Sequence, residues 1–454
     1  MAQFLSTAEV AGLAGVHRDT LLRWLRNGSV PEPRRDGRGW RVFSARDVAA
    51  VVAYANGGED ETENDPAIAR LKAIEWDFAT AKTGYLTHNL HPYPAKFIPQ
   101  IPNALIQELS AVGDTVADIF CGSGTTLLEA VLLRRHAVGI DANPLAALIS
   151  KAKTTPFDAV GVEALEQHCQ ACRQVAESIE PNVGDLFHDG RPFGSNGWRP
   201  AAEICEFWFE PHVVEELAEL RRLIDEVPGE AERRLGMVTL AAIVVAVSKQ
   251  DSDTRYVRRD KAIAPGDTIH RYLAQLQSAM VAVREINALI DDRFGCRVLH
   301  ANVLDGPDVG ALDLVVASPP YPNAYSYHLY HRSRLAWLGF DPKQFKQVEM
   351  GSHRKYSAKG RNRATPDTFA QEFVKIFQWL RGYLRERGYV CLVVGDSTLN
   401  GERIDNASLI AGAGATAGFR EVARIGRNIA PTRKAFNPRI GKIKSENILV
   451  LRKR

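Results

Sequence analysis

The chain has 454 residues, of which 45% are hydrophobic and 24% charged, and its formal net charge is +3. This composition is typical of globular proteins and excludes a wholly disordered or collagen-like chain, while the small net charge means that any affinity for nucleic acid must come from local patches. Six cysteines are too few for a disulfide scaffold, and neither a membrane-spanning apolar run nor a basic-then-apolar secretion signal occurs, so a reduced cytoplasmic interior is the expectation.

Residues 1–56 form the first predicted unit. Ser6 or Thr7 is suited to cap a first helix, and a second helix is expected over 17–26, with leucines inward and arginines outward. Two short helices joined by a glycine-containing turn are the helix-turn-helix pattern. After these two helices in the chain, Asp36-Gly37 predicts a hairpin, or wing.

This segment resembles the winged helix-turn-helix domains of MerR-type and excisionase-type DNA-binding proteins. Residues 1–46 hold eight Arg against four acidic residues. The resemblance implies contacts to double-stranded DNA from Arg18, Arg23 and Arg38. A small helical module for dimerisation or protein contact is the alternative, which leaves a homodimer open.

Residues 57–66 carry five acids and no apolar residue, so they are interpreted as an acidic linker. Residues 67–454 form the second predicted domain. Helical patterns between short apolar segments predict an α/β fold with a mostly parallel sheet, in which the last two strands form an antiparallel pair. Residues 156–290 are almost entirely helical in pattern, as an insertion would be. The seven expected strands are Thr115–Phe120, Ala137–Asp141, Arg297–Ala301, Asp313–Ser318, Tyr389–Gly395, Arg420–Ile425 and Asn447–Leu451.

A glycine-rich turn follows the first of these strands, in Asp118-Ile119-Phe120-Cys121-Gly122-Ser123-Gly124-Thr125-Thr126. Glycines permit the tight turn and let a ligand approach the backbone. The segment lacks the Gly-Lys-Ser/Thr of a phosphate-binding P-loop. Asp141 ends the next strand, where a carboxylate can accept both hydroxyls of a ribose. A helix cap before Pro144 is the alternative role of Asp141.

The segment Ser318-Pro319-Pro320-Tyr321 ends a later apolar strand. Two prolines fix the backbone, so a hydroxyl, stiff carbonyls and an aromatic ring are held together. This set suits a planar ring that bears an amine, because oxygens accept from NH₂ and Tyr321 offers a stacking face. A proline-rich turn that only closes the strand is the alternative.

Together, these three motifs resemble the S-adenosylmethionine-dependent DNA amino-methyltransferases, which modify N4 of cytosine or N6 of adenine. The upstream segment Thr87-His88-Asn89-Leu90-His91-Pro92-Tyr93-Pro94-Ala95-Lys96-Phe97-Ile98-Pro99 resembles the part of permuted members that covers the methionine end of the cofactor. The resemblance implies a seven-stranded Rossmann-like methyltransferase sheet with a reversed last strand. The long helical insertion departs from the family and leaves the target-recognition region undefined.

Residue roles follow from the resemblance by position. The methionine part of the cofactor is assigned to Asp118 and to Phe120, Cys121, Gly122, Gly124, Thr125 and Thr126, with Lys96 approaching its carboxylate. Asp141 and the adjacent Ala142 are assigned to the ribose, and Asn302 to the adenine. Ser318, Pro319, Pro320 and Tyr321 are assigned to the flipped target base.

Further DNA contacts are expected from basic clusters, mainly to phosphates. Residues 352–363 hold five Lys or Arg and no acid, and residues 255–261 form a second cluster. A third cluster lies around Arg433. Solvated loops are the alternative for each. The contact residues assigned are Arg255, Arg258, Arg354, Lys355 and Arg361.

The form of the target motif favours N4 of cytosine, with N6 of adenine as the alternative. A covalent cytosine-C5 mechanism is disfavoured because the chain has no Pro-Cys dipeptide, and the lone Cys169-Gln170-Ala171-Cys172 is interpreted as packing rather than a zinc site. An RNA methyltransferase and an effector-binding transcriptional regulator are the alternatives from other classes. A restriction partner is left open, and no metal is expected.

Overall fold

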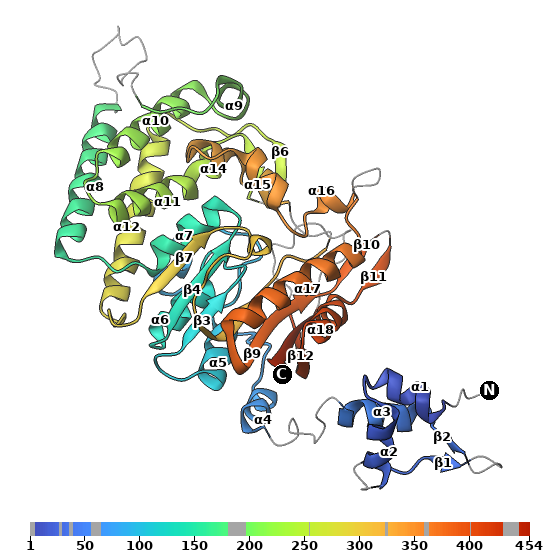
Figure 1. The fold of residues 1–454 in the computed structure, drawn as a ribbon. Coiled ribbons are helices and arrows are strands. Elements are labelled where there is room, and N and C mark those ends of the chain that lie inside the picture. Colours follow the sequence, from blue (N-terminus) through green and yellow to red (C-terminus); the bar gives the residue numbers. More distant parts are fainter. Residues whose placement is uncertain are drawn as a thin grey trace. The chain divides into compact units, whose positions relative to one another are not determined.

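The computed structural model describes residues 5–26, 30–35, 40–55, 65–179, 197–253, 255–322, 326–357, 363–399, 401–429 and 445–454 (Figure 1). Two compact units, 1–73 and 74–454, divide the chain. The predicted division, with a linker at 57–66, remains a prediction. Within the described residues, no helix is long and apolar enough to cross a membrane.

The first unit has the elements of a winged helix-turn-helix. The Ser6 hydroxyl accepts from the backbone N–H of Glu9, whose carboxylate accepts from the N–H of Ser6, so the first helix starts with a capping box. Val10, Leu21 and Phe43 are fully buried in the small core. The elements are α1 (Thr7–Leu13), α2 (Arg18–Arg26), the antiparallel pair β1 (Arg34–Arg35) and β2 (Arg41–Val42), α3 (Ala45–Ala55) and α4 (Pro66–Ala73).

The second unit is built on a seven-stranded sheet of order β12-β13-β9-β8-β3-β4-β7. Pairing is parallel from β9 through to β7, and β13 runs antiparallel to both of its neighbours. All seven predicted strands and the antiparallel last pair are therefore confirmed. The strands are β3 (Thr115–Asp118), β4 (His136–Asp141), β7 (Cys296–His300), β8 (Leu312–Ala317), β9 (Leu384–Gly395), β12 (Phe419–Asn428) and β13 (Ser445–Lys453).

Helices pack against this sheet. Phe369, Phe373 and Phe377 of α17 are fully buried in one core with Ala117 and Val315 of the sheet, and each buried ring contributes about 1.5–3 kcal/mol. The sheet helices and short 3₁₀ turns are η1 (Leu86–Asn89), α5 (Gln100–Leu109), α6 (Thr125–Leu132), α7 (Pro144–Thr154), η2 (Val303–Asp305), α17 (Pro366–Tyr383) and α18 (Asn406–Thr416). A small antiparallel pair, β10 (Ser397–Leu399) and β11 (Glu402–Ile404), lies between β9 and α18.

The predicted insertion is largely helical, with one exception. Val238–Val247, a stretch of apolar residues, lies in a buried helix, and Cys169 and Cys172 are buried in the same core. The exception is an antiparallel hairpin of β5 (Gln250–Ser252) and β6 (Arg255–Arg258), which the helical pattern did not predict because each strand is so short. The insertion helices are α8 (Ala159–Ile179), α9 (Ala202–Trp208), α10 (Pro211–Asp225), α11 (Glu230–Val247) and α12 (Asp267–Asn287).

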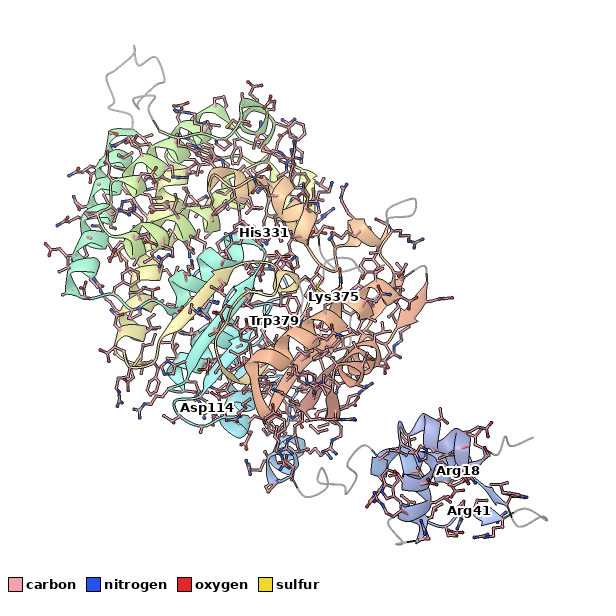
Figure 2. The ribbon with its side chains drawn as sticks, in the orientation of Figure 1. Arg18, Arg41, Asp114, His331, Lys375 and Trp379 are labelled. Atoms are coloured by element: carbon pink, nitrogen blue, oxygen red, sulfur yellow. The ribbon has the colours of Figure 1, made fainter. Side chains whose placement is uncertain are left out.

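Four short helices follow β8 in the chain. They are α13 (Tyr327–Tyr330), α14 (Arg332–Trp337), α15 (Pro342–Val348) and α16 (His353–Tyr356). Of these, α14 packs against α9 and α11, and α13 lies beside β6, so the segment after β8 joins the insertion (Figure 1). His331 lies where the insertion meets the sheet (Figure 2).

Candidate active site

The three sequence motifs lie at the ends of three neighbouring strands. The sheet order puts β3 between β8 and β4, and all three run parallel. Their carboxyl ends therefore meet at one edge of the sheet, where ligands of open α/β sheets bind. The glycine turn follows β3, Asp141 ends β4, and Ser318 follows β8.

The glycine turn packs closely against α7 at Gly124 and is open at Gly122. Gly122 and Gly124 both have positive φ, 48° and 75°. A Cβ on Gly124 would lie 2.9 Å from Cα of Ser150, so α7 packs directly against this backbone. A Cβ on Gly122 would have only ordinary contacts, the nearest being Cε1 of Tyr93 at 3.5 Å. Gly124 is thus required by packing, whereas Gly122 leaves room on the turn's open side.

The carboxylate of Asp141 joins the turn to β4. Its Oδ2 accepts from the N–H of Gly122 and its Oδ1 from the N–H of Asn143, both at 2.8 Å. Burial raises the pKa of Asp141 to about 6, although these two backbone donors oppose the shift. Each carboxylate oxygen can accept a second hydrogen bond, so ribose hydroxyls fit beside the backbone donors. The helix cap at this position is Asn143.

Asp118 lies deeper, at the end of β3. It is 3% exposed and accepts from the N–H of Phe120 at 3.0 Å. Burial raises the pKa of Asp118 to about 7, and the nearby Asp141 adds to the shift. A cation bound at this edge would lower the pKa of both carboxyl groups, because an opposite charge nearby favours the ionised form.

The Ser-Pro-Pro-Tyr corner is anchored to β9. The Ser318 hydroxyl donates to the carbonyl of Val393 at 3.3 Å, and the Tyr321 hydroxyl donates to the same carbonyl at 3.2 Å. The Ser318 bond is long, and its oxygen keeps lone pairs to accept from an amine. Gly351 packs over the corner, because a Cβ there would lie 2.7 Å from the carbonyl oxygen of Tyr321.

Tyr93 links the two halves of this edge. Its hydroxyl accepts from the Asn143 side chain at 3.2 Å. Its ring stacks on His331 and Tyr327, with centroids 5.1 and 5.8 Å apart. Since both of these follow the target motif in the chain, Tyr93 connects the cofactor side to the target side. Beside it is an open cleft of about 410 Å³, lined by Asn89, His91, Pro92, Tyr93, Pro94, Lys96 and Asp253.

The remaining predicted cofactor residues have other contacts. The Lys96 ammonium donates to the carbonyl of His88. The Asn302 side chain caps η2, accepting from the N–H of Leu304 at 3.1 Å. Ala142 follows Asp141 at the same edge. Cys121 is buried, with its sulfur 3.6 Å from the Ser150 hydroxyl. Phe120 lies against the core of α17. Thr125 and Thr126 start α6.

A buried polar cluster behind the turn was not predicted. Glu129 of α6 is 1% exposed and accepts from the Tyr85 hydroxyl at 2.6 Å and from the Asn103 side chain at 2.6 Å. It also lies 2.8 Å from Nε2 of His88. Lys153 of α7 is 1% exposed, and its ammonium has no hydrogen-bond partner. The signal in the sequence was a charged residue within each largely apolar helix pattern, which is Glu129 alone in α6 and Lys153 together with Lys151 in α7.

The predicted DNA contacts lie in several places. Arg18 and Arg23 are exposed on α2 of the first unit, and Figure 2 labels Arg18 there. Arg255 and Arg258 are exposed on β6, and on α16 Arg354 is exposed while Lys355 is half-buried. Arg38, Arg361 and the cluster around Arg433 lie outside the described residues, as does most of the 57–66 segment.

Comparisons with known proteins agree with the motifs. Residues 53–152 match the family model described as DNA methylase, and residues 5–54 match the model of the MerR HTH family of regulatory proteins. In the chain, the segment that matches the DNA methylase model follows the segment that matches the MerR-type helix-turn-helix model. The resemblance predicted from the motifs is confirmed for both segments.

The chain is also similar to several Type II methyltransferases. M.MvaI of Kocuria varians is 33% identical over 174 residues, which is 38% of this chain and 36% of that protein. M.BsoBI of Geobacillus stearothermophilus is 23% identical over 298 residues, 58% of this chain and 54% of that protein. The alignments thus span only part of each relative. Among solved structures, an rRNA methyltransferase, aviRa from Streptomyces viridochromogenes, matches with a TM-score of 0.29 at 11% identity, covering 85% of this chain and 94% of that chain.

The DNA methylase match implies S-adenosylmethionine as the methyl donor. The residues present fit such a ligand. Among the described residues, the hydroxyl of Thr125 is buried at the turn without a hydrogen-bond partner, and Asp141 retains acceptor capacity for a ribose. Asp118 and Asp141 place two carboxyl groups against the backbone of the turn.

Proposed function

We propose that this protein is a DNA methyltransferase that transfers a methyl group from S-adenosylmethionine to the exocyclic amine of a flipped base, with N4 of cytosine favoured. The observation that carries the proposal is the meeting of three motifs at the carboxyl ends of β8, β3 and β4. A ligand seated on the glycine turn and a base held by the Ser318–Tyr321 corner would be neighbours there.

In this proposal, each group of residues has a separate role. The glycine turn, Asp118 and Asp141 bind and orient the cofactor, which supplies an electrophilic methyl group when bound. The Ser318 hydroxyl and the Pro319 carbonyl accept hydrogen bonds from the target NH₂. These bonds favour a pyramidal nitrogen whose lone pair is aimed at the methyl group. The Tyr321 hydroxyl, tied to the Val393 carbonyl, fixes the ring on which the base stacks.

The transfer itself is direct. With the cofactor bound, its methyl group would pass to the amine nitrogen as the carbon–sulfur bond breaks, while the Ser318 hydroxyl and the Pro319 carbonyl hold that nitrogen, and the amine would then lose a proton to solvent. Positioning and electrostatics provide the acceleration, and the target base must first leave the duplex stack. Ser318 in place of an acid supports cytosine as the base; adenine N6 is the competing assignment.

Duplex DNA is the proposed partner. The exposed Arg18 and Arg23 on α2 support this choice, because the second helix of a helix-turn-helix is the one that enters the major groove. Double-stranded RNA hides its major groove from such a helix. Cation contacts to phosphates predict that binding weakens steeply with salt.

The test is a methyl-transfer assay with labelled S-adenosylmethionine on duplex DNA and on structured RNA, followed by mass spectrometry of the released nucleosides. We expect N4-methylcytosine from DNA alone. Detection of N6-methyladenine in place of N4-methylcytosine would make adenine the target base. Labelling of the RNA without labelling of the DNA would refute the DNA assignment. Absence of transfer to either polymer, with intact cofactor binding, would refute the enzyme proposal.

A further inference from the structure

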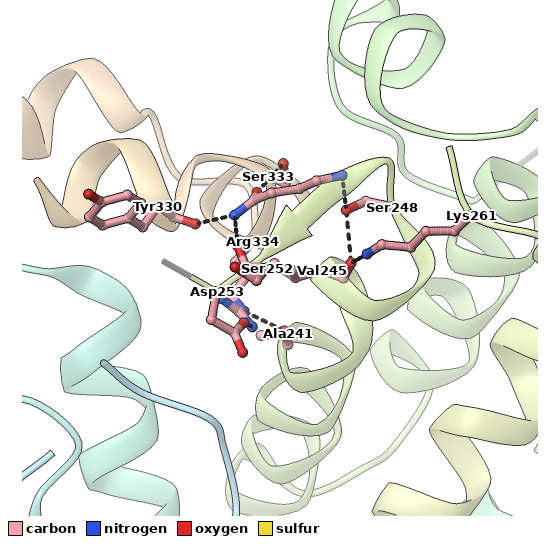
Figure 3. Close-up of polar contacts among 10 residues, drawn as sticks. Ala241, Val245, Ser248, Ser252, Asp253, Lys261, Tyr330, Ser333 and Arg334 are labelled. Carbon is pink, nitrogen blue, oxygen red and sulfur yellow. Dashed lines mark hydrogen bonds and ion pairs between the residues drawn. The ribbon is translucent and has the colours of Figure 1, made fainter. Parts of the chain in front are cut away.

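The β5–β6 hairpin of the insertion is bound to the segment that follows the target motif. The Gln250 side chain donates to the carbonyl of Tyr330 at 3.2 Å and accepts from the Ser333 hydroxyl at 3.4 Å. The fully buried Arg334 forms an ion pair with Asp253 and donates to the carbonyl of Ala241 at 2.9 Å (Figure 3). Because Gln250, Ser333 and Arg334 are buried, the hairpin and α13–α14 are held as one piece.

This network fixes where the hairpin lies. Asp253, at the end of β5, lines the same open cleft as Tyr93 and Lys96. Tyr93 in turn stacks on Tyr327 and His331 of the α13–α14 segment. The hairpin therefore borders the edge of the sheet at which the cofactor and base motifs meet, although it belongs to an insertion that lies far from them in the chain.

The two faces of β6 differ. Tyr256 and Arg258 face α9, since the Tyr256 ring lies 4.6 Å from that of Trp208 and Arg258 lies over the ring of Phe207. Alternation along the strand turns Arg255 and Val257 to the other face. Val257 is 54% exposed, and the Arg255 side chain is 55% exposed with a single ion pair to Asp251 at 3.2 Å. We call Arg255 and Val257 the outward face of the hairpin.

We propose that this outward face reads base edges in the major groove next to the methylated base; this rests on the proposed function. A two-stranded ribbon fits the major groove of B-DNA. Arg255 offers a guanidinium that matches the two acceptors of guanine, and Val257 offers methyl groups for contact with a thymine methyl. The Arg255 side chain is more than half exposed, and Asp251 also pairs with Arg259 at 3.6 Å, so Arg255 can leave Asp251 for a base without stranding that carboxylate.

The experiment compares matched exposed residues of the same insertion. Arg255→Ala is paired with Arg284→Ala, because Arg284 is also exposed, at 52%, and also forms one ion pair, with Glu166. Val257→Ala is paired with Val281→Ala, both valines being 54% exposed. Each full-length variant methylates a pool of duplexes with randomised flanks, and sequencing that detects the modified base reports the preferred flanks. Gel-shift binding to one fixed set of duplexes is measured in parallel.

Arg255→Ala should reduce discrimination at a guanine position by about 5- to 150-fold, and Val257→Ala should relax a thymine position more weakly. The two control variants should keep the wild-type preference. Unchanged flanks, or a uniform loss of affinity across all sequences with a smaller salt dependence, would overturn the base-reading proposal while methylation continues. If the wild type methylates nothing, the proposed function fails; the hairpin proposal then stands or falls on whether Arg255→Ala, unlike Arg284→Ala, changes the ranking of the bound duplexes.

Discussion

The two glycines of the cofactor turn should respond very differently to alanine. Both have positive φ, which costs about 1–2 kcal/mol for any residue with a Cβ. At Gly124 the new methyl group would also lie 2.8 Å from Oγ and 2.9 Å from Cα of Ser150. Overpacking of this kind costs about 1–3 kcal/mol more. Gly124→Ala should therefore destabilise the fold by about 2–5 kcal/mol in total.

Gly122→Ala lacks the second cost, because its nearest neighbour would be the Tyr93 ring at 3.5 Å. Its methyl group instead occupies the open side of the turn, where we propose that the cofactor binds. The variant should lose only about 1–2 kcal/mol of stability, yet bind S-adenosylmethionine about tenfold or more weakly.

Urea unfolding followed by tryptophan fluorescence measures the first quantity, and equilibrium dialysis with labelled cofactor measures the second. The reasoning is refuted if the two variants unfold at the same urea concentration. It is also refuted if Gly122→Ala binds the cofactor as tightly as the wild type.

Three further predictions concern the target corner and the carboxylates. Ser318→Ala should lower kcat about 100- to 1000-fold, as expected for loss of an amine acceptor, with cofactor affinity unchanged by dialysis; equal kcat would argue against this role. Tyr321→Phe keeps the ring and removes the hydroxyl, which donates to the Val393 carbonyl and lies 3.4 Å from the Glu446 carboxylate, so stability should fall by about 0.5–1.5 kcal/mol with kcat nearly retained, whereas Tyr321→Ala should abolish transfer in single-turnover assays. Because burial raises the pKa of Asp141 to about 6, its charged form is disfavoured on folding, and its contribution to ligand-free stability should decline as pH rises from about 4 to about 6. Cofactor affinity should rise over pH 5 to 7 as Asp141 ionises, and titration calorimetry of Asp141→Asn should show a flatter profile than the wild type.

Much of the sheet and both motif-bearing turns were predictable from local pattern. Each motif can be recognised within a few residues, because turn chemistry and strand alternation are local properties. The motifs are a strand end followed by Gly-x-Gly, a strand ending in Asp141 and an apolar strand ending in two prolines. The seven strands and the capping box at Ser6 were found in this way. The β5–β6 hairpin was missed because two such short strands carry too little alternation to stand out from a helical region.

What the sequence alone determined is the set of chemical parts: a glycine turn, an acid, a rigid Ser-Pro-Pro-Tyr corner and an arginine-rich helix-turn-helix. Only the tertiary structure decided which parts meet. Tyr93 stacks on His331, and Arg334 binds Asp253 of the insertion, although long stretches of chain separate the partners in each pair. The burial of Glu129 and Lys153 could not be predicted from the sequence either, because a helix pattern shows which face is apolar but not which neighbour will cover it. Contacts of this kind depend on how the sheet, its helices and the insertion pack together in three dimensions, and no local pattern of residue types encodes that packing.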